Sequence, residues 1–364
     1  MALFSEIFED RTSLGVKIKT DEYALSGKYA IVDQGQKEIA GYTDREEGVY
    51  SDVPALIFGD HTRIVKYIDQ PFFLGADGVK LLKARDKDAN YKYLYYALQS
   101  IRIPNTGYNR HFKWLKEADV RYPDAETQEQ VVLILDKLSD LIAHIRCLLT
   151  ELDTLIKSRF VEMFGDPETN PYGWVQVTVD DVCSSVVRGP FGSALKKEFF
   201  VQPDETTYKV YEQKHAIQKS ATIGTYYVTA EKYNELRRFE CCAGDILMSC
   251  SGTTGELYQL PEDCERGIIN QALCKFTLNE RILPIVFLIY MHETIANLET
   301  KGSGIQNIAA VSYVKAMTIN LPPMEIQEKF SAFVQKTDKL KAAEQKRLEQ
   351  TEILFDSLMQ RYFG

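Results

Sequence analysis

Apolar residues recur at alternating steps of four and three along residues 126–165. The positions are Val131, Leu135, Leu138, Ile142, Ile145, Leu149, Leu152 and Ile156. This spacing is that of a coiled-coil seam, and no glycine or proline interrupts it before Gly165. It predicts a long helix whose apolar stripe packs against a second helix. A single amphipathic helix lying on a domain core explains eight consecutive seam positions less well.

Residues 325–364 repeat residues 126–165 without a gap. "ETQEQVVLILDKLSDL" begins at Glu126, "EIQEKFSAFVQKTDKL" begins at Glu325, and both copies end in Phe-Gly. The second copy predicts a second helix, whose obvious partner is the first, and forty helical residues span about 60 Å. Its seam is interrupted by Lys341 and Glu344. The positions predicted for contact between the helices or for partner docking are Phe330, Val334, Leu340, Leu348, Leu354 and Phe355, of which Leu340 and Leu354 lie beside the seam.

Turn-forming residues divide the chain around the two helices. Proline precedes each helix, and "GDPETNPYGW" follows the first. The predicted domains are a globule at 1–124, a helix at 125–165, a globule at 166–323 and a helix at 324–364. An apolar strand and an aromatic-rich helix are expected in each globule, at "PALIFGD" and "YKYLYYALQS" and again at "DILMSCSGT" and "LPIVFLIYMHET". The fold class is therefore α+β, with two mixed α/β domains and an internal repeat.

Composition is that of a water-soluble globular protein. The chain is 45% hydrophobic and 26% charged. Its 364 residues are too many for one ordinary hydrophobic core. The sequence contains no run of about 18 apolar residues, the length that would predict a membrane span. The N-terminus does not resemble a secretory signal. The seven cysteines form no C-x-x-C pair, which favours reduced thiols in a cytoplasmic protein over a metal site.

The net charge of −9 argues against a simple polycationic nucleic-acid binder. Basic and amide side chains nevertheless gather in glycine- and aromatic-containing loops of both globules. These residue types hydrogen-bond base edges and phosphates, although any one of them is more often an ordinary surface residue. The candidate DNA contacts are Lys28, Gln34, Gln36, Arg110, His111 and Lys113, followed by Arg188, Lys196, Lys197, Arg237, Arg238, Gln306 and Asn307.

Catalytic motifs are missing from the sequence. There is no phosphate-binding G-x-x-x-x-G-K-[ST] loop, no G-x-S-x-G elbow and no H-E-x-x-H pair. "TNPYGW" is similar to the N-P-P-Y motif of amino-methyltransferases, but without a preceding strand it favours a turn. We therefore predict no catalytic residues and no metal ligands.

The repeated "PDAETQEQ" and "PPMEIQEK" segments, the junction "SRFVEMFGDPETNPYGW" and the ending "LFDSLMQRYFG" resemble the DNA-specificity (S) subunit of type I restriction-modification enzymes. The resemblance covers essentially the whole chain and implies an internal pseudo-two-fold repeat. Each globule would be a target-recognition domain reading one half of a bipartite, asymmetric site on double-stranded DNA. Two antiparallel helices would set the spacing between the half-sites.

The resemblance also implies partners. The helices would dock two methyltransferase subunits, through which restriction subunits that translocate DNA would join. S-adenosylmethionine, ATP and Mg would bind to those partners and not to this chain. One departure from the family is that the first globule is shorter, 124 residues against 158, and a few N-terminal residues of the usual pattern are absent.

Two other functions are alternatives to DNA recognition. The chain could be a DNA methyltransferase or nuclease with unrecognised motifs, which binding of S-adenosylmethionine by the chain alone would favour. It could also be a helical scaffold without a nucleic-acid role. Replacement of the basic clusters separates these possibilities, because only a DNA-recognition subunit loses DNA methylation without losing assembly.

Overall fold

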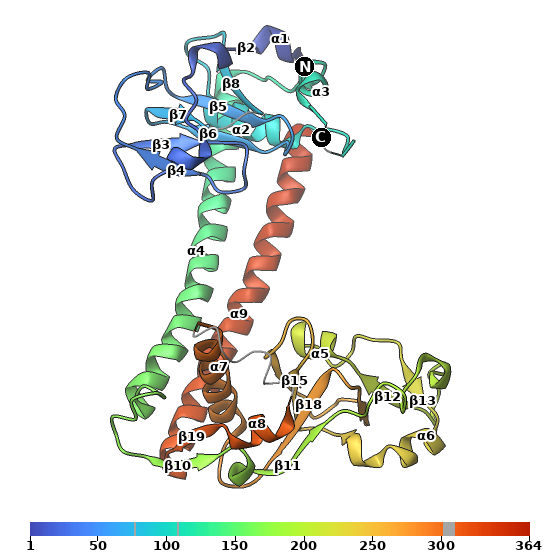
Figure 1. Ribbon diagram of the computed structural model, residues 1–364. Coiled ribbons are helices and arrows are strands. Elements are labelled where there is room, and N and C mark those ends of the chain that lie inside the picture. The colour runs from blue at the N-terminus through green and yellow to red at the C-terminus, as the bar shows by residue number, and fades with distance from the viewer. Residues whose placement is uncertain (76–77, 108, 301–309) are drawn as a thin grey trace. The chain divides into compact units, whose positions relative to one another are not determined.

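The computed structural model describes residues 1–75, 78–107, 109–300 and 310–364 (Figure 1). It divides into two compact units. Unit 1 comprises Met1–Leu149 and Ala343–Gly364, and unit 2 comprises Thr150–Ala342. Each unit holds a mixed α/β globule and one half of each of two forty-residue helices, α4 (Ala125–Phe164) and α9 (Met324–Phe363). The predicted α+β class with two long helices is confirmed.

Unit 1 contains two main sheets. The first has the antiparallel order β2-β8-β5-β6, formed by Phe8–Asp10, Val79–Ala84, Ala55–Gly59 and Val65–Ile68. The second has the order β4-β3-β7, formed by Gly41–Thr43, Tyr29–Val32 and Phe72–Leu74, with β3 and β7 parallel. A short ladder joins β1 (Ala2–Leu3) to β9 (Asp119–Val120). Two short helices complete the globule, α1 (Phe4–Ile7) and α3 (Phe112–Lys116).

The aromatic-rich helix α2 (Tyr91–Ser100) covers the first sheet of unit 1. The side chain of Asn90 accepts a hydrogen bond from the backbone N–H of Tyr93 at 3.0 Å and so caps the first turn of α2. Tyr93, Leu94 and Leu98 are buried in one apolar cluster with Leu56 and other strand residues. Burial of this face, and not helix propensity, holds the helix in place, because a ten-residue helix is marginal in isolation.

Unit 2 repeats this arrangement, with one additional strand in its second sheet. Its first sheet has the antiparallel order β11-β18-β15-β16, formed by Cys183–Arg188, Leu273–Leu278, Ile246–Ser249 and Leu257–Gln259. The second has the order β13-β12-β17-β14, formed by Tyr227–Val228, Tyr208–Tyr211, Gly267–Ile269 and Glu240–Cys241, with β12 and β17 parallel. β10 (Val175–Thr178) pairs with β19 (Thr318–Leu321). The other helices are α5 (Gln213–Ile217), α6 (Ala230–Glu235), α7 (Pro284–Thr300) and α8 (Val311–Ala316).

The two long helices pack antiparallel in both units. In unit 1 the start of α4, with Val131 and Leu135, shares an apolar cluster with Phe355 near the end of α9. In unit 2 the end of α4 meets the start of α9, where the ring of Phe330 lies 5.7 Å from that of Phe160. Because the first half of each helix lies against the second half of the other, the pair is antiparallel.

The predicted seam of α4 is buried or half-buried along its length, whereas several other apolar positions of the helix are exposed. Val131, Leu135, Ile145 and Leu152 are buried, and the remaining four predicted seam residues are half-buried. Leu133, by contrast, is 58% exposed. A period of 3.5 residues therefore distinguishes the packed face from the free face, as the sequence pattern predicts.

The seam of α9 is buried at its apolar positions, and the two leucines predicted beside it are exposed. Phe330, Val334 and Leu348 are buried, whereas Leu340 and Leu354 are 59% and 48% exposed. The buried positions between the apolar ones are threonines. Each donates its hydroxyl within the helix, Thr337 to the carbonyl of Phe333 and Thr351 to that of Arg347. The hydroxyls are thus satisfied, and the threonine methyl groups can face the seam.

The repeated glutamines explain the repeated helix starts. Gln128 and Gln327 are buried, and their amides donate to the carbonyls of Pro123 and Pro322 at 2.8 and 2.9 Å. Each bond folds the proline-containing entry segment back onto the first turn. The shared P-x-x-E-x-Q pattern therefore stabilises the first turn of each long helix.

The "TNPYGW" segment is a turn that closes the end of α4, as predicted. The side-chain oxygen of Asn170 accepts from the N–H of Trp174, and the Trp174 indole donates to the carbonyl of Phe164 at 2.9 Å. Gly165 ends the helix with φ = +80°, a conformation that favours glycine. These side chains serve the helix end, which leaves no methyltransferase role for the motif.

Candidate nucleic-acid interface

Three loops of unit 1 meet around residues 59–62, which follow β5. The side-chain oxygen of Gln34, after β3, accepts from the backbone N–H of His61 at 3.1 Å. The Nδ1 atom of His61 lies 3.2 Å from the carbonyl oxygen of Asn109. The structure therefore brings together two predicted clusters that are far apart in sequence, Gln34 and the segment that contains Arg110 and Lys113.

His111 plays a structural part in this assembly. Its side chain is fully buried, its Nδ1 atom lies 3.0 Å from the carbonyl oxygen of Asp60, and its backbone N–H donates to the same oxygen at 2.8 Å. The carboxylate of Asp60 accepts from the N–H of Phe112 at 2.8 Å. This burial argues against a direct DNA contact by His111. Sequence reasoning missed Asp60, whose only signal was its place directly after a buried strand.

Arg110 and Lys113 flank the buried histidine and are both exposed. The ammonium group of Lys113 lies 4.8 Å from the centre of the Trp114 ring, a cation–π distance. The buried His111 fixes this turn. Arg110 lies one position before it and Lys113 two positions after it, so the turn presents two cations. That arrangement suits phosphate contacts.

Lys28 lies apart from the other candidates of unit 1. It precedes β3 whereas Gln34 follows it, so the two lie at opposite ends of this strand. The ammonium group of Lys28 pairs with the Glu46 carboxylate at 2.5 Å. The hydrogen bond to Glu46 raises the pKa of Lys28, and the same bond lowers the pKa of Glu46. Gln36 is exposed and lines a groove of about 660 Å³ together with Lys66 and Tyr95.

Arg188 is anchored to the backbone at the end of β11. Its Nε atom donates to the carbonyl of Gln271 at 2.8 Å, and one of its terminal nitrogens lies 3.4 Å from the carbonyl oxygen of Cys250. The guanidinium therefore ties together the edge strand and two loops of unit 2. This geometry indicates a positioning role for Arg188 at least as strongly as a contact with DNA.

The remaining basic candidates of unit 2 surround one apolar cluster. Leu195 packs against the cluster that contains Leu236, which places Lys196 and Lys197 in the same part of the unit as Arg237 and Arg238. All four basic side chains are exposed. Their ion pairs are loose, because Lys196 lies 3.6 Å from Glu198 and Arg237 lies 4.0 Å from Glu240.

Glu240 is an acidic residue near these bases, and its carboxylate is bonded to other groups. Burial alone would raise the pKa of Glu240, but hydrogen bonds from Tyr233 and Arg266 lower it below its ordinary value. The carboxylate is therefore ionised and already partnered, which leaves Arg237 only weakly engaged. Gln306 and Asn307, the last two candidates, lie outside the described residues.

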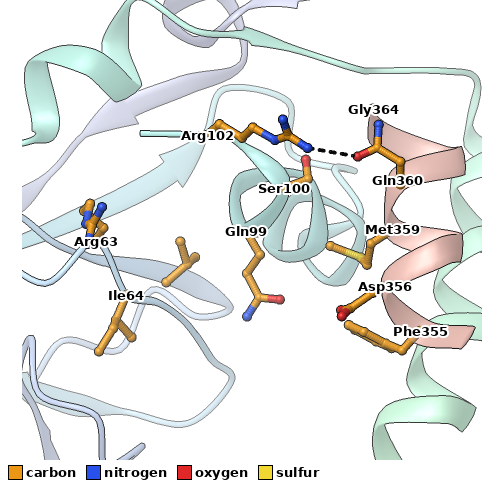
Figure 2. A pocket seen from close by; sticks show the side chains of 11 residues that line it. Arg63, Ile64, Gln99, Ser100, Arg102, Phe355, Asp356, Met359, Gln360 and Gly364 are labelled. Carbon is orange, nitrogen blue, oxygen red and sulfur yellow. Dashed lines mark hydrogen bonds between the residues drawn. The ribbon is translucent and has the colours of Figure 1, made fainter. Parts of the chain in front are cut away.

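A groove of unit 1 lies between the end of α2 and the last turns of α9 (Figure 2). It has a volume of about 810 Å³, and Arg102 donates to the side-chain oxygen of Gln360 across it at 3.4 Å. Asp356 is the one acidic side chain in its lining, which contains no histidine or cysteine.

Residues 1–75, 78–107, 109–300 and 310–364 contain no group of three or more histidine, cysteine, aspartate or glutamate side chains placed to hold a metal ion. Among the helices in those ranges, none is long and apolar enough to cross a membrane.

Solved structures share this fold. A type I restriction-modification S subunit from M. genitalium matches with a TM-score of 0.59 and 16% identity, over 100% of this chain and 95% of that one. A chain from a structure of complex assembly and conformational transition in the type I R-M system matches with a TM-score of 0.57 and 15% identity, over 96% and 91% of the two chains. At these identities the likeness is one of fold.

No curated protein matches the sequence significantly. The model of the type I restriction modification DNA specificity domain, however, matches twice, at residues 5–153 and 171–352. These two matches cover most of the chain and coincide with its internal repeat. The chain therefore belongs to the type I restriction-modification DNA specificity family, whose members recognise DNA sequence and do not themselves catalyse its modification or cleavage.

Proposed function

We propose that the globules at 1–124 and 166–323 are two target-recognition domains, each of which reads one half of a bipartite, asymmetric DNA site. The observation that supports this most strongly is the double family match, one to each half of the chain. The two globules share the strand order of their first sheet but differ in their loop sequences. Because loops supply base contacts, two unlike half-sites are expected.

The proposed contacts in the first domain are Gln34, Gln36, Arg110 and Lys113, with Lys28 as a separate contact at the far end of β3. In the second domain they are Lys196, Lys197, Arg237 and Arg238, with Arg188 holding the loop. Gln306 and Asn307 remain predictions. Exposure and weak ion pairing support these residues, because a cation with few internal partners loses little when it binds phosphate.

The two helices, proposed as spacers at 125–165 and 324–364, also offer a docking surface for two methyltransferase subunits. Their outer faces expose apolar side chains, including Leu133, Leu155, Leu340 and Leu354. Leu155 and Leu354 occupy equivalent positions of the repeat. A pair of equivalent patches suits two copies of one partner.

Catalysis then belongs to the rest of the assembly, which we place in the cytoplasm. S-adenosylmethionine would bind to the methyltransferase subunits, and ATP and Mg to restriction subunits that translocate DNA. The net charge of −9 supports this division, because such a chain alone attracts DNA weakly. We expect weak DNA binding by the isolated chain and much tighter, salt-sensitive binding by the assembled complex.

Mapping of methylated sites in cells that contain this chain and its methyltransferase subunit tests the proposal. The expected result is a split motif with a fixed unread spacer. Arg110→Ala with Lys113→Ala, or Lys196→Ala with Lys197→Ala, should reduce methylation while the complex still assembles. Leu138→Asp with Leu149→Asp, in the seam, should disrupt assembly instead. A continuous motif, or normal methylation by both basic double variants, would contradict the proposal.

A further inference from the structure

A five-position sequence pattern recurs where the edge strand of each main sheet ends. Arg11, Leu14, Gly15, Ile18 and Lys19 have the same spacing as Arg188, Phe191, Gly192, Leu195 and Lys196, 177 residues later. The pattern begins at the end of β2 in unit 1 and at the end of β11 in unit 2. These strands hold the same place in two sheets of the same strand order, so the two loops are structurally equivalent.

Each loop exposes one large apolar side chain at its tip. Leu14 is 62% exposed and Phe191 is 89% exposed, whereas the second apolar position points inward, with Ile18 buried and Leu195 half-buried. An exposed phenylalanine is costly in water, because its ring gives up the burial that otherwise stabilises it. The same exposure at equivalent sites of two diverged domains indicates a contact with something outside the chain.

The tips are held by firm anchors. In unit 2 the backbone N–H of Gly189 donates to the carbonyl of Leu273 at 3.0 Å, and a methyl group on Gly189 would overlap the backbone oxygen of Asn270. In unit 1 the N–H of Arg11 donates to the carbonyl of Leu81 at 2.8 Å, and the N–H of Leu14 donates to that of Arg11 at 2.9 Å. The exposed side chains are therefore presented from fixed backbone and not from a loose tail.

The charge of the tips favours an anionic occupant. Residues 11–20 contain three basic and no acidic side chains, and so do residues 188–197, in a chain of net charge −9. Acids of the flanking segments engage part of this charge, because Arg11 pairs with Glu9 and Asp52, and Lys196 lies 3.6 Å from Glu198. Lys19 and Lys196 are both exposed. An acidic protein partner would meet these charges too, but the chain already has an apolar docking surface on its helices, and the loops lie on the globules.

We propose that Leu14 and Phe191 are wedges that insert between base steps of the DNA, one in each half-site, while the neighbouring lysines bind phosphates. This inference rests on the proposed DNA-recognition function and deepens it. Leucine and phenylalanine are among the side chains that partly unstack base steps in this way. Unstacking costs least at pyrimidine–purine steps, so each wedge would add a preference at a step that it does not hydrogen-bond.

The test uses the complex of this chain with its methyltransferase subunits and duplexes that contain the motif mapped in cells. Phe191→Ala should weaken binding about tenfold, because stacking of a base on one aromatic ring is worth roughly one factor of ten to a hundred. Leu14→Ala should weaken binding by a smaller factor, because an aliphatic side chain contacts a base without stacking on it. Phe191→Leu should retain most of the affinity. Leu25→Ala is the matched control, since Leu25 is fully exposed in unit 1 but lies outside the loop.

A 2-aminopurine base, placed in turn at each position of the half-site, reports unstacking as increased fluorescence. The wild-type complex should show the increase at one step per half-site, and Phe191→Ala should abolish it in one half only. Wild-type affinity and fluorescence in both Phe191→Ala and Leu14→Ala would overturn the wedge proposal. Loss of complex assembly in these variants would also overturn it, because the tips would then be contacts with a protein subunit. If Lys196→Ala with Lys197→Ala weakened binding in that case, the DNA-recognition function would stand without the wedge.

Discussion

Replacement of Phe330 by alanine tests the antiparallel helix pairing directly. Phe330 is the seventh residue of α9, and its side chain is fully buried against the end of α4. Its ring lies edge-on to those of Phe160 and Phe164, with centroid distances of 5.7 and 5.1 Å. If the helices did not meet in this direction, these three rings would not share a core.

The expected loss of stability in Phe330→Ala follows from the burial of this side chain. Truncation of a buried phenylalanine costs about 3–5 kcal/mol, because transfer energy is lost and a cavity remains. Each aromatic pair contributes about 0.5–1.5 kcal/mol of that loss. Leu340→Ala, on the same helix, is the control. Leu340 is 59% exposed, so its replacement should change the stability by less than about 0.5 kcal/mol.

Each unit contains one of the two tryptophans, Trp114 in unit 1 and Trp174 in unit 2, which makes a selective assay possible. In a Trp114→Phe background the fluorescence of Trp174 reports on unit 2, because its indole is bonded to the last residue of α4. Urea unfolding followed at Trp174 should give a much lower midpoint for Phe330→Ala than for Leu340→Ala. Equal midpoints for the two variants would refute the pairing.

Three further outcomes follow from the structure. Leu135→Ala, at a fully buried seam position of unit 1, should lower the free energy of unfolding by about 2–5 kcal/mol, whereas Leu133→Ala should change it little, as measured by urea unfolding followed at Trp114. Burial lowers the pKa of His215, so below the unfolded value of about 6.5 the unfolded chain binds a proton that the folded chain excludes. Unit 2 should therefore lose stability as pH falls below that value, and a flat unfolding midpoint between neutral and acidic pH would contradict this. Gly189→Ala should destabilise unit 2 by about 1–3 kcal/mol in the same unfolding assay, because its methyl group would meet backbone, whereas Gly192→Ala would meet only a movable glutamine side chain.

Much of the fold could be predicted because its signals are local. The alternation of four and three residues along 126–165 depends only on helix geometry, so the seam of α4 needed no tertiary information. The gapless repeat showed that whatever one half forms, the other half forms too. Proline before each helix and Gly165 after the first marked the helix ends by their backbone preferences alone.

The second helix shows where a pattern of apolar residues is insufficient. Thr337 and Thr351 occupy the buried stripe although both are polar, because a threonine hydroxyl can bond to the preceding turn and leave its methyl group free to pack. Leu340 and Leu354 are apolar yet exposed, since the geometry of the seam, and not hydropathy, decides which face meets the partner helix.

The sequence by itself determined the helices, the repeat and the family, because periodicity and turn chemistry act between residues close in the chain. Only the tertiary structure decided the roles of single side chains. It buried His111 over the carbonyl of Asp60, bound Arg188 to two carbonyls, and left Phe191 in solvent. A composition of Arg, His and Lys cannot distinguish these cases, since hydrogen-bond partners come from loops far apart in sequence that only folding brings together.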